Sequence, residues 1–258
     1  MSTSGRLLWE QTGARIPAFI EAPSTRYYRA CEKGLFLEFF PALRGKRLLK
    51  TDLWDEAKNT QILKWAAERG ARVYGLDISS SILREARGHF GRGRGRSRFV
   101  LSDLRQMAFR DNSFDLLYSM GTVEHFPEFR QALEECYRVL KPGGRAVIGV
   151  PNKFDPFLRP LLVWLLTRLS LYAYGFEKSF SLRELEVLLK ETGFEVEGRT
   201  GILFLPGWLR LADLWLHIRW PKLSFLVAPL IAPFEALNRR FKFLRRHGYL
   251  IACAVRKA

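Results

Sequence analysis

Short apolar segments alternate with amphipathic segments along most of this chain, and this alternation is the feature that most restricts its fold. Five of the apolar segments predict strands, at 47–53, 72–77, 99–103, 114–119 and 145–151. Apolar residues at helical spacing predict helices between them, at 59–69, 80–87 and 129–140. Strands that alternate with helices indicate βαβ units, in which helices cover both faces of a parallel sheet.

Polar residues stand at the ends of the first four predicted strands. They are Asp52, Asp77, Asp103 and Ser119. The carboxyl ends of parallel strands meet at one edge of a sheet, and ligands of such folds bind in the crevice beyond that edge. The sequence therefore predicts a ligand site to which these four positions contribute.

The two ends of the chain differ from this middle part. Two further strands are predicted at 194–204 and 249–255, and they are separated by a segment rich in tryptophan, leucine and proline. The predicted division of the chain is an N-terminal helical segment at 1–45, a main domain at 46–204 with 248–258, and an apolar, basic insertion at 205–247.

Several local motifs together carry a resemblance to a known family. They are the strand 114–119, the tripeptide 123–125, the Leu-Lys-Pro-Gly-Gly turn at 140–144, and the segment 177–181 before a leucine-rich helix. With these motifs the chain resembles the class I S-adenosylmethionine-dependent methyltransferases, and within them the branch that includes ubiquinone and menaquinone biosynthesis enzymes. The resemblance covers roughly residues 48–204 and the closing strand.

The resemblance implies a fold, a cofactor and a set of binding residues. The fold is α/β, a Rossmann-like and mostly parallel seven-stranded sheet with helices on both faces. The cofactor is S-adenosyl-L-methionine, with Asp77 on the ribose hydroxyls, Asp103 on the adenine amino group, and Ile78 and Leu104 on either side of the adenine. The implied cofactor-binding residues are Thr51, Asp52, Leu53, Glu56, Asp77, Ile78, Ser79, Asp103, Leu104, Ser119 and Gly121.

The first loop departs from the family pattern. The family has an acid and a Gly-x-Gly turn after its first strand, where glycine lets the backbone approach the cofactor. Residues 50–60 contain no glycine here, and the loop is roughly four residues longer than usual. Either Asp52 or Glu56 binds the methionine amino group through a rebuilt loop, or the site serves another nucleotide-like ligand or none. In the last case the chain is a catalytically degenerate binding or scaffold protein.

His125 is the candidate catalytic residue, because it follows the fourth strand where a methyl acceptor would lie. A histidine there can deprotonate a hydroxyl group, since its ordinary pKa is about 6.5. The alternative is a residue at the start of a helix that only supports packing. The other histidines show no ligand spacing, and the three cysteines are far apart, so no metal site is expected.

The formal net charge of +16 leaves two classes of partner, nucleic acid and an anionic membrane surface. From Leu205 to the end there are ten Lys and Arg residues against two acids, and tryptophans and leucines lie among them. The Gly-Arg run at 91–96 precedes a strand, so it predicts a basic loop and no phosphate-binding turn. This distribution favours interfacial helices on a membrane over nucleic-acid binding.

The expected activity is therefore methyl transfer to a small lipophilic acceptor by a cytoplasmic protein associated peripherally with a membrane. No apolar stretch reaches the 18 residues or more of a membrane-spanning helix. The N-terminus lacks the apolar core of a signal peptide. An oligomer interface or a lid over an apolar pocket is the alternative interpretation of the insertion.

Overall fold

The computed structural model describes residues 3–90 and 97–258. Residues 1–2 and 91–96 lie outside this description, so the basic loop expected at 91–96 stays a prediction. The strands are β1 (Arg47–Lys50), β2 (Arg72–Asp77), β3 (Ser97–Leu101), β4 (Phe114–Met120), β5 (Leu140–Pro151), β6 (Phe194–Ile202) and β7 (Leu250–Lys257).

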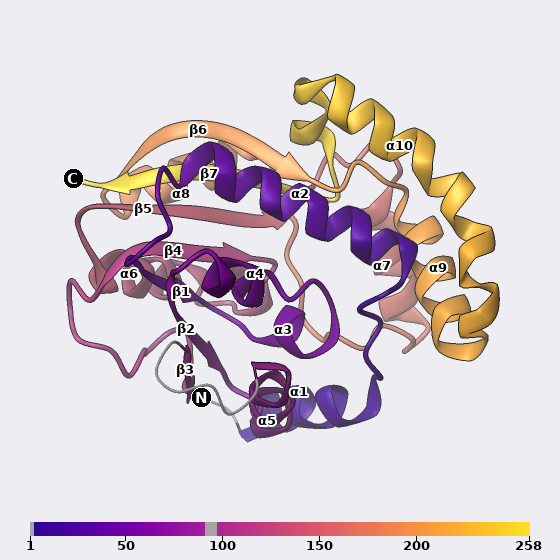
Figure 1. Ribbon diagram of the computed structural model, residues 1–258, viewed down its shortest axis with the longest axis horizontal. Helices are drawn as coiled ribbons and strands as arrows, with labels where there is room; N and C mark the ends of the chain where they lie inside the picture. Colours follow the sequence, from indigo (N-terminus) through magenta and orange to yellow (C-terminus); the bar gives the residue numbers. More distant parts are fainter. Residues whose placement is uncertain (1–2, 91–96) are drawn as a thin grey trace.

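These strands form one sheet in the order β3-β2-β1-β4-β5-β7-β6 (Figure 1). β1 pairs in parallel with β2 and β4, and β5 pairs in parallel with β4. β7 runs antiparallel to both β5 and β6. The predicted fold is thus confirmed as a Rossmann-like, mostly parallel seven-stranded sheet.

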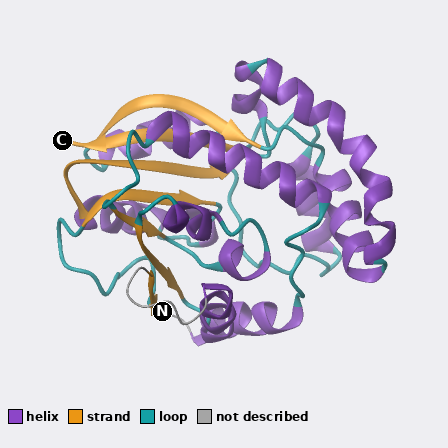
Figure 2. Ribbon diagram, in the orientation of Figure 1, coloured by secondary structure: helices purple, strands orange, loops and turns teal. Residues whose placement is uncertain are grey.

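Helices surround the sheet and extend beyond one end of it (Figure 2). The α-helices are α1 (Thr3–Arg15), α2 (Pro23–Phe39), α3 (Trp54–Lys58), α4 (Ile62–Glu68), α5 (Ser80–Phe90), α6 (Phe129–Val139), α7 (Arg159–Arg168), α8 (Leu182–Glu191), α9 (Gly207–Arg219) and α10 (Ala228–Arg240). The 3₁₀ helices are η1 (Val123–His125), η2 (Pro221–Val227) and η3 (Lys242–His247).

The core has two halves, one on each face of the sheet. Successive strand residues point to opposite faces, so Leu48 packs with α2, α4 and α5, whereas Leu49 packs with α6 and α8. Burial on both faces explains why the strands are apolar runs rather than alternating patterns.

The first strand is shorter than predicted. It ends at Lys50 rather than at Leu53, because the next residues turn away and α3 begins at Trp54. The Thr51 N–H donates to the Tyr118 carbonyl at 3.2 Å, which is the last backbone bond between this strand end and β4. Residues 51–53 therefore lie above the sheet edge instead of within the sheet.

The N-terminal helix α1 is joined to the start of α5 by one carboxylate. Glu10 accepts hydrogen bonds from the backbone N–H groups of Ser80 and Ser81 at 2.7 and 3.0 Å, and from the hydroxyls of Ser79 and Ser80. These N–H groups have no partner inside α5, and a negative charge suits a helix N-terminus. The contact places α1 beside the carboxyl end of β2.

The segment 205–247 forms α9, η2, α10 and η3, which lie with α7 at one end of the molecule (Figure 1). α9 contacts α7, α2 and η2, and α10 contacts α2 and η2. Among the described residues, no helix is long and apolar enough to cross a membrane. The division of the chain into domains stays a prediction.

Candidate active site

A cavity of about 200 Å³ lies at the carboxyl ends of β1, β2 and β4. Asp52, Asp77 and Gly121 line it from the sheet. Residues of α1, α2, α9 and the segment 172–177 line its other sides. The strand ends and the more distant helices therefore enclose one space.

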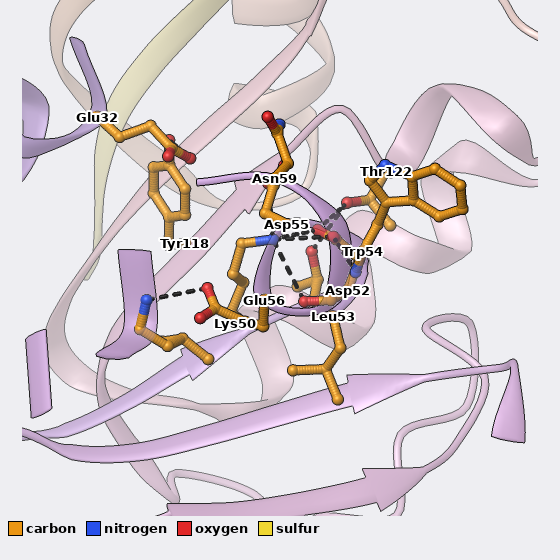
Figure 3. Close-up of polar contacts among 12 residues, drawn as sticks. Glu32, Lys50, Asp52, Leu53, Trp54, Asp55, Glu56, Asn59, Tyr118 and Thr122 are labelled. Atoms are coloured by element: carbon orange, nitrogen blue, oxygen red, sulfur yellow. Dashed lines mark hydrogen bonds and ion pairs between the residues drawn. The ribbon is translucent and has the colours of Figure 1, made fainter. Parts of the chain in front are cut away.

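The loop after β1 is organised around the buried ammonium group of Lys50 (Figure 3). Lys50 Nζ lies 2.8 Å from both carboxylate oxygens of Asp52 and 3.1 Å from Asp55 Oδ2. The short helix α3 brings Asp52 and Asp55 to the same side of the loop, three residues apart. One cation thus holds together the two acids of a loop that has no glycine.

Asp52 is held from three directions. Besides Lys50, it accepts hydrogen bonds from Thr122 Oγ1 at 2.9 Å and from the Trp54 N–H at 3.1 Å. Thr122 follows β4, so this carboxylate also links the ends of β1 and β4. The Asp52 side chain lines the cavity, and Thr51 and Asp55 line it as well.

Burial and ion pairing act in opposite directions on these groups. Burial by itself lowers the pKa of Lys50, but the charges of Asp52 and Asp55 outweigh it and raise that pKa above its ordinary value. Burial raises the pKa of Asp52, and Lys50 opposes the shift. Glu32, buried nearby, has a pKa raised well above its usual range by burial and accepts the Tyr118 hydroxyl at 2.9 Å. Lys50 therefore stays charged, and its acid partners depend on it.

Asp77 ends β2 and is also almost fully buried. Its two oxygens accept backbone N–H groups, from Leu53 at 2.9 Å and from Ser79 at 2.8 Å. Burial raises the pKa of Asp77 to about 7, although both hydrogen bonds oppose the shift. A carboxylate oxygen has two lone pairs, so each oxygen can accept a further bond from the cavity.

Seven of the residues predicted from the sequence line the cavity. They are Thr51, Asp52, Asp77, Ile78, Leu104, Gly121 and His125. The sheet topology brings them together from four separate stretches of sequence. Gly121 has a φ of +75°, a conformation that glycine adopts readily, and it leaves the floor of the cavity without a side chain.

Leu53 and Glu56, both in the first loop, do not line the cavity. Leu53 packs over Gly75, where an added Cβ would clash with the Leu53 side chain. Glu56 faces α4 and accepts the Leu63 N–H at 2.9 Å, and burial raises its pKa to about 7. Of the two acids considered for the methionine amino group, only Asp52 faces the cavity.

Three other predicted residues also lie outside the cavity lining. Ser119 accepts a hydrogen bond from Thr51 Oγ1 at 2.8 Å in the interior. Ser79 is buried and uses its N–H on Asp77. Asp103 lies two residues beyond β3 and pairs with Arg105 at 2.8 Å, so the neighbouring residues Ser102 and Leu104 face the cavity instead.

Four aromatic side chains that the sequence did not predict line the cavity together with His125. Trp9 of α1 lies 4.9 Å from the His125 ring and 6.3 Å from Trp54, measured between ring centroids. Tyr174 lies 5.5 Å from Trp54 and 5.6 Å from Tyr172. Trp9, Tyr172 and Tyr174 come from two segments that carry no motif, and Trp54 comes from the first loop. We call these five aromatic residues, Trp9, Trp54, His125, Tyr172 and Tyr174, the aromatic cap.

His125 is held with one ring nitrogen engaged. Its Nδ1 lies 2.9 Å from the Phe176 carbonyl oxygen, which assigns the proton to Nδ1 and leaves Nε2 as an acceptor. Burial lowers the pKa of His125, so the ring is neutral at pH 7. Nε2 is 3.9 Å from Glu124 Oε1, and burial raises the pKa of Glu124 well above its usual range. Burial thus shifts the pKa of both side chains toward the neutral form, down for His125 and up for Glu124.

Arg159 and Glu177 form a buried ion pair at the same end of the cavity. The guanidinium donates two parallel hydrogen bonds to Glu177, to Oε1 at 2.6 Å and to Oε2 at 2.9 Å. The Tyr172 hydroxyl donates to Glu177 Oε2 as well. The segment that carries Phe176 is therefore anchored next to His125. Within the described residues, no group of three or more His, Cys, Asp or Glu side chains could hold a metal ion.

Comparison with known proteins points to one family. Residues 56–148 match the family model described as a methyltransferase domain. Phosphoethanolamine N-methyltransferase 2 of Caenorhabditis elegans is 33% identical over 89 residues, which are 34% of this chain and 20% of that protein. Demethylmenaquinone methyltransferase of Lactiplantibacillus plantarum is 32% identical over 120 residues, 43% of this chain and 51% of that protein. The chain thus spans about half or less of the length of these relatives.

A solved structure shares the fold over the whole chain. It is Haemonchus contortus phosphoethanolamine N-methyltransferase 2 in complex with phosphomonomethylethanolamine and S-adenosylhomocysteine. The match has a TM-score of 0.61 at 21% identity and covers 99% of this chain and 57% of that one. At this identity the likeness concerns the fold alone.

Replacement of Lys50 by methionine tests the role of the buried ammonium. We expect Lys50→Met to lower the free energy of unfolding by roughly 3–5 kcal/mol, because Asp52 and Asp55 lose their buried counter-charge. Urea denaturation followed by circular dichroism measures the change. Lys46→Met is the matched control at an exposed position before β1, and its effect should stay within about 0.5 kcal/mol. Equal stabilities of the two variants would contradict this role of Lys50.

Proposed function

This chain belongs to the class I S-adenosylmethionine-dependent methyltransferases, and on that premise we propose that it transfers a methyl group from S-adenosylmethionine to a small lipophilic acceptor at a membrane surface. The acceptor enters from the side of α9. The proposal of a lipophilic acceptor and a membrane surface rests on one observation, that α9 buries charged side chains and exposes large apolar ones.

The residues of the cavity fit the cofactor despite the altered first loop. Asp77 would accept the ribose hydroxyls, because each of its oxygens retains a lone pair. Ile78 and Leu104 supply apolar walls for the adenine. Asp52 is a fixed acid whose side chain is 16% exposed, and it would hold the methionine ammonium, a role for which the amide of a glycine loop is not needed. Carboxylates at two neighbouring strand ends supply the hydrogen-bond acceptors that the ribose hydroxyls and the ammonium group of this cofactor require.

S-adenosylmethionine supplies, when bound, a methyl group on a sulfonium centre that is open to attack by a nucleophile. The chain contributes position and a base. The aromatic cap lines the cavity, and orientation of the acceptor would be the main contribution to the rate. His125 Nε2 would receive the proton that the acceptor gives up, because its lone pair is free and the ring is neutral at pH 7.

Helix α9 buries two charged residues, Arg210 and Asp213, and exposes several of its large apolar residues. Arg210 is 8% exposed and Asp213 is fully buried, whereas Trp208 and Trp215 are 60% and 59% exposed. A helix at a water-facing surface has the opposite arrangement, with its apolar stripe toward the core. The outward face of α9 is therefore suited to an apolar environment.

Neighbouring elements extend this face into an apolar surface. We define the apolar surface by exposed residues of α7, α9, η2 and α10: Leu161, Trp164, Trp208, Trp215, Phe225 and Leu230. α7 and η2 contact α9, and α10 contacts η2. Large exposed apolar patches mark interaction sites, and tryptophans beside basic residues such as Arg219 and Lys222 suit an anionic lipid surface.

The cavity continues to this surface through α9. Leu211 and Leu214 both line the cavity, and Leu211 is also exposed between the outward tryptophans. A lipophilic molecule could thus pass from the apolar surface to the aromatic cap along leucine side chains. This continuity supports an acceptor drawn from the membrane.

Calorimetric titration with S-adenosylhomocysteine tests the cofactor site. We expect binding whose affinity rises up to roughly tenfold from pH 6 to pH 8, because Asp77, with a pKa of about 7, becomes an ionised acceptor over this range. Asp77→Asn should flatten the pH dependence. Without ligand, the raised pKa instead lowers stability as pH rises from about 4 to about 7, since the unfolded chain gives up this proton first. No binding at millimolar ligand would refute the enzyme and favour a membrane-docking scaffold.

Transfer of label tests the role of His125. With tritiated S-adenosylmethionine and a bacterial total lipid extract, we expect label in the organic phase. His125→Gln should reduce the rate roughly 100-fold and leave S-adenosylhomocysteine affinity unchanged, because only proton transfer is lost. His247→Gln is the control at an exposed histidine. A rate for His125→Gln within twofold of the unchanged protein would assign His125 to packing.

Flotation with lipid vesicles tests the apolar surface. The double variant Trp208→Ser/Trp215→Ser should bind phosphatidylglycerol vesicles at least about tenfold more weakly, because two exposed aromatic side chains no longer enter the interface. Leu37→Ser is the matched control, since Leu37 is 71% exposed on α2 and outside the apolar surface. Equal flotation of the two variants would count against a membrane contact through α9.

A further inference from the structure

Arg210 is a buried cation that reaches the cavity from α9. It is 8% exposed and lines the cavity next to Tyr28 and Asn59. Its guanidinium makes two long bonds, to Ser24 Oγ at 3.2 Å and to Asn59 Oδ1 at 3.4 Å. Both acceptors are uncharged. The Tyr28 ring lies 5.2 Å away and covers one side of the group.

Two other buried cations, Lys50 and Arg159, have carboxylate partners, and Arg210 differs from them. Lys50 contacts Asp52 and Asp55, and Arg159 contacts Glu177. Over residues 3–90 and 97–258, no carboxylate lies within 4.0 Å of Arg210. A guanidinium has five N–H donors in a planar fork, and the two bonds to neutral oxygens leave most of them unused.

The nearest acid on the same helix, Asp213, uses one carboxylate oxygen elsewhere, and its Oδ1 is buried without a hydrogen-bond partner among the described residues. Asp213 accepts the backbone N–H of Ser24 at 2.7 Å and so satisfies the N-terminus of α2, where no local side chain does. It lies on the same face of α9, one turn further on, but beyond ion-pair distance from Arg210. Asp213 therefore explains how α9 is fixed to α2, and it leaves the guanidinium facing the cavity.

Arg210 is a polar group beside apolar side chains that extend from the cavity to the apolar surface. Leu214 follows it by four residues, so the two side chains lie next to each other on the inward face of α9. Leu211 continues the path to the apolar surface. A buried cation is stable only when it is paired and hydrogen-bonded, and charge-assisted bonds to carboxylate or phosphate are the strongest available to arginine.

We propose that Arg210 binds an anionic oxygen group, a carboxylate or a phosphate, of an amphiphilic acceptor whose apolar part lies against Leu211 and Leu214. This inference rests on the proposed function for the use of the cavity, and it adds that the acceptor carries a negative charge. The fork of Arg210 would replace its two long bonds to neutral oxygens with short bonds to the anion. The acceptor class is thus an anionic amphiphile.

Calorimetric titration with short-chain amphiphiles below their micellar concentration tests the proposal. Octyl phosphate and octanoate should bind at least about tenfold more tightly than 1-octanol, which has the same chain and no charge. Arg210→Gln should remove this preference and leave 1-octanol affinity unchanged. Arg210→Lys, which keeps the charge, should retain part of it. A tighter response to only one of the two anions would identify the group that the site prefers.

Two variants distinguish the Arg210 guanidinium from the general charge of the surface and from a loss of folding. Arg219→Gln removes an exposed charge from the same helix and should leave the preference unchanged, so an equal loss in this variant would overturn the proposal in favour of general surface charge. Arg210→Lys keeps the charge at this position, so its partial retention of the preference covers the case in which Arg210→Gln fails to fold. Equal affinity of the unchanged protein for all three amphiphiles, or no binding of any, would also overturn it.

Titration of the same samples with S-adenosylhomocysteine separates the two proposals. Binding of S-adenosylhomocysteine without a preference for anions would refute only the role of Arg210. A preference for anions without binding of S-adenosylhomocysteine would refute the cofactor site and support the anion site. Arg210→Gln should not change S-adenosylhomocysteine affinity, because Asp52 and Asp77 do not contact Arg210.

Discussion

The buried ammonium of Lys50 is the interaction on which the candidate site depends. In the family pattern, glycine lets the backbone of the first loop come close to the cofactor. This chain fills the loop with side chains and a short helix, and three acids would repel one another there without a cation. The ammonium holds Asp52 and Asp55 in place. Electrostatic attraction thus holds together a first loop that contains no glycine.

The same network extends to the segment before the last strand. Asn59, at the end of α3, donates to Asp55 at 2.7 Å, accepts the Thr25 hydroxyl at 3.0 Å and accepts from Arg210. One amide therefore joins the first loop, α2 and α9. Asp213 adds a second bond between α9 and α2. A helix with an apolar outer face is in this way attached to the part of the molecule that faces the cofactor site.

The sequence predicts the sheet better than it predicts the site. The strands are apolar runs of the right length with helices between them, and burial on both faces makes that pattern hard to mistake. Asp52 and Asp77 follow from their places at strand ends. The orientation of Glu56 does not, because a one-residue difference within the short helix α3 decides whether an acid faces the cavity or α4. The local sequence pattern predicts Lys50 only as a strand residue. Its buried ion pairs with Asp52 and Asp55 depend on the path of the folded loop, which no local pattern predicts.

The aromatic cap and Arg210 were missed for a related reason. Trp9, Tyr174 and Arg210 come from segments far apart in the sequence, and only the folded chain places them around one cavity. Helix α9 shows how such a feature could still be recognised. Its large apolar residues recur at 208, 211, 215 and 218, while Arg210 and Asp213 stand on the opposite side. A helix with this period and two charges on its narrow inner face must either bury them unpaired or give them partners inside the protein. Burial of a charged side chain without a partner costs several kcal/mol, about as much as one apolar side chain gains from its burial. The two inward charges of α9 therefore indicate a polar site in the interior. Its outward tryptophans indicate an apolar environment outside.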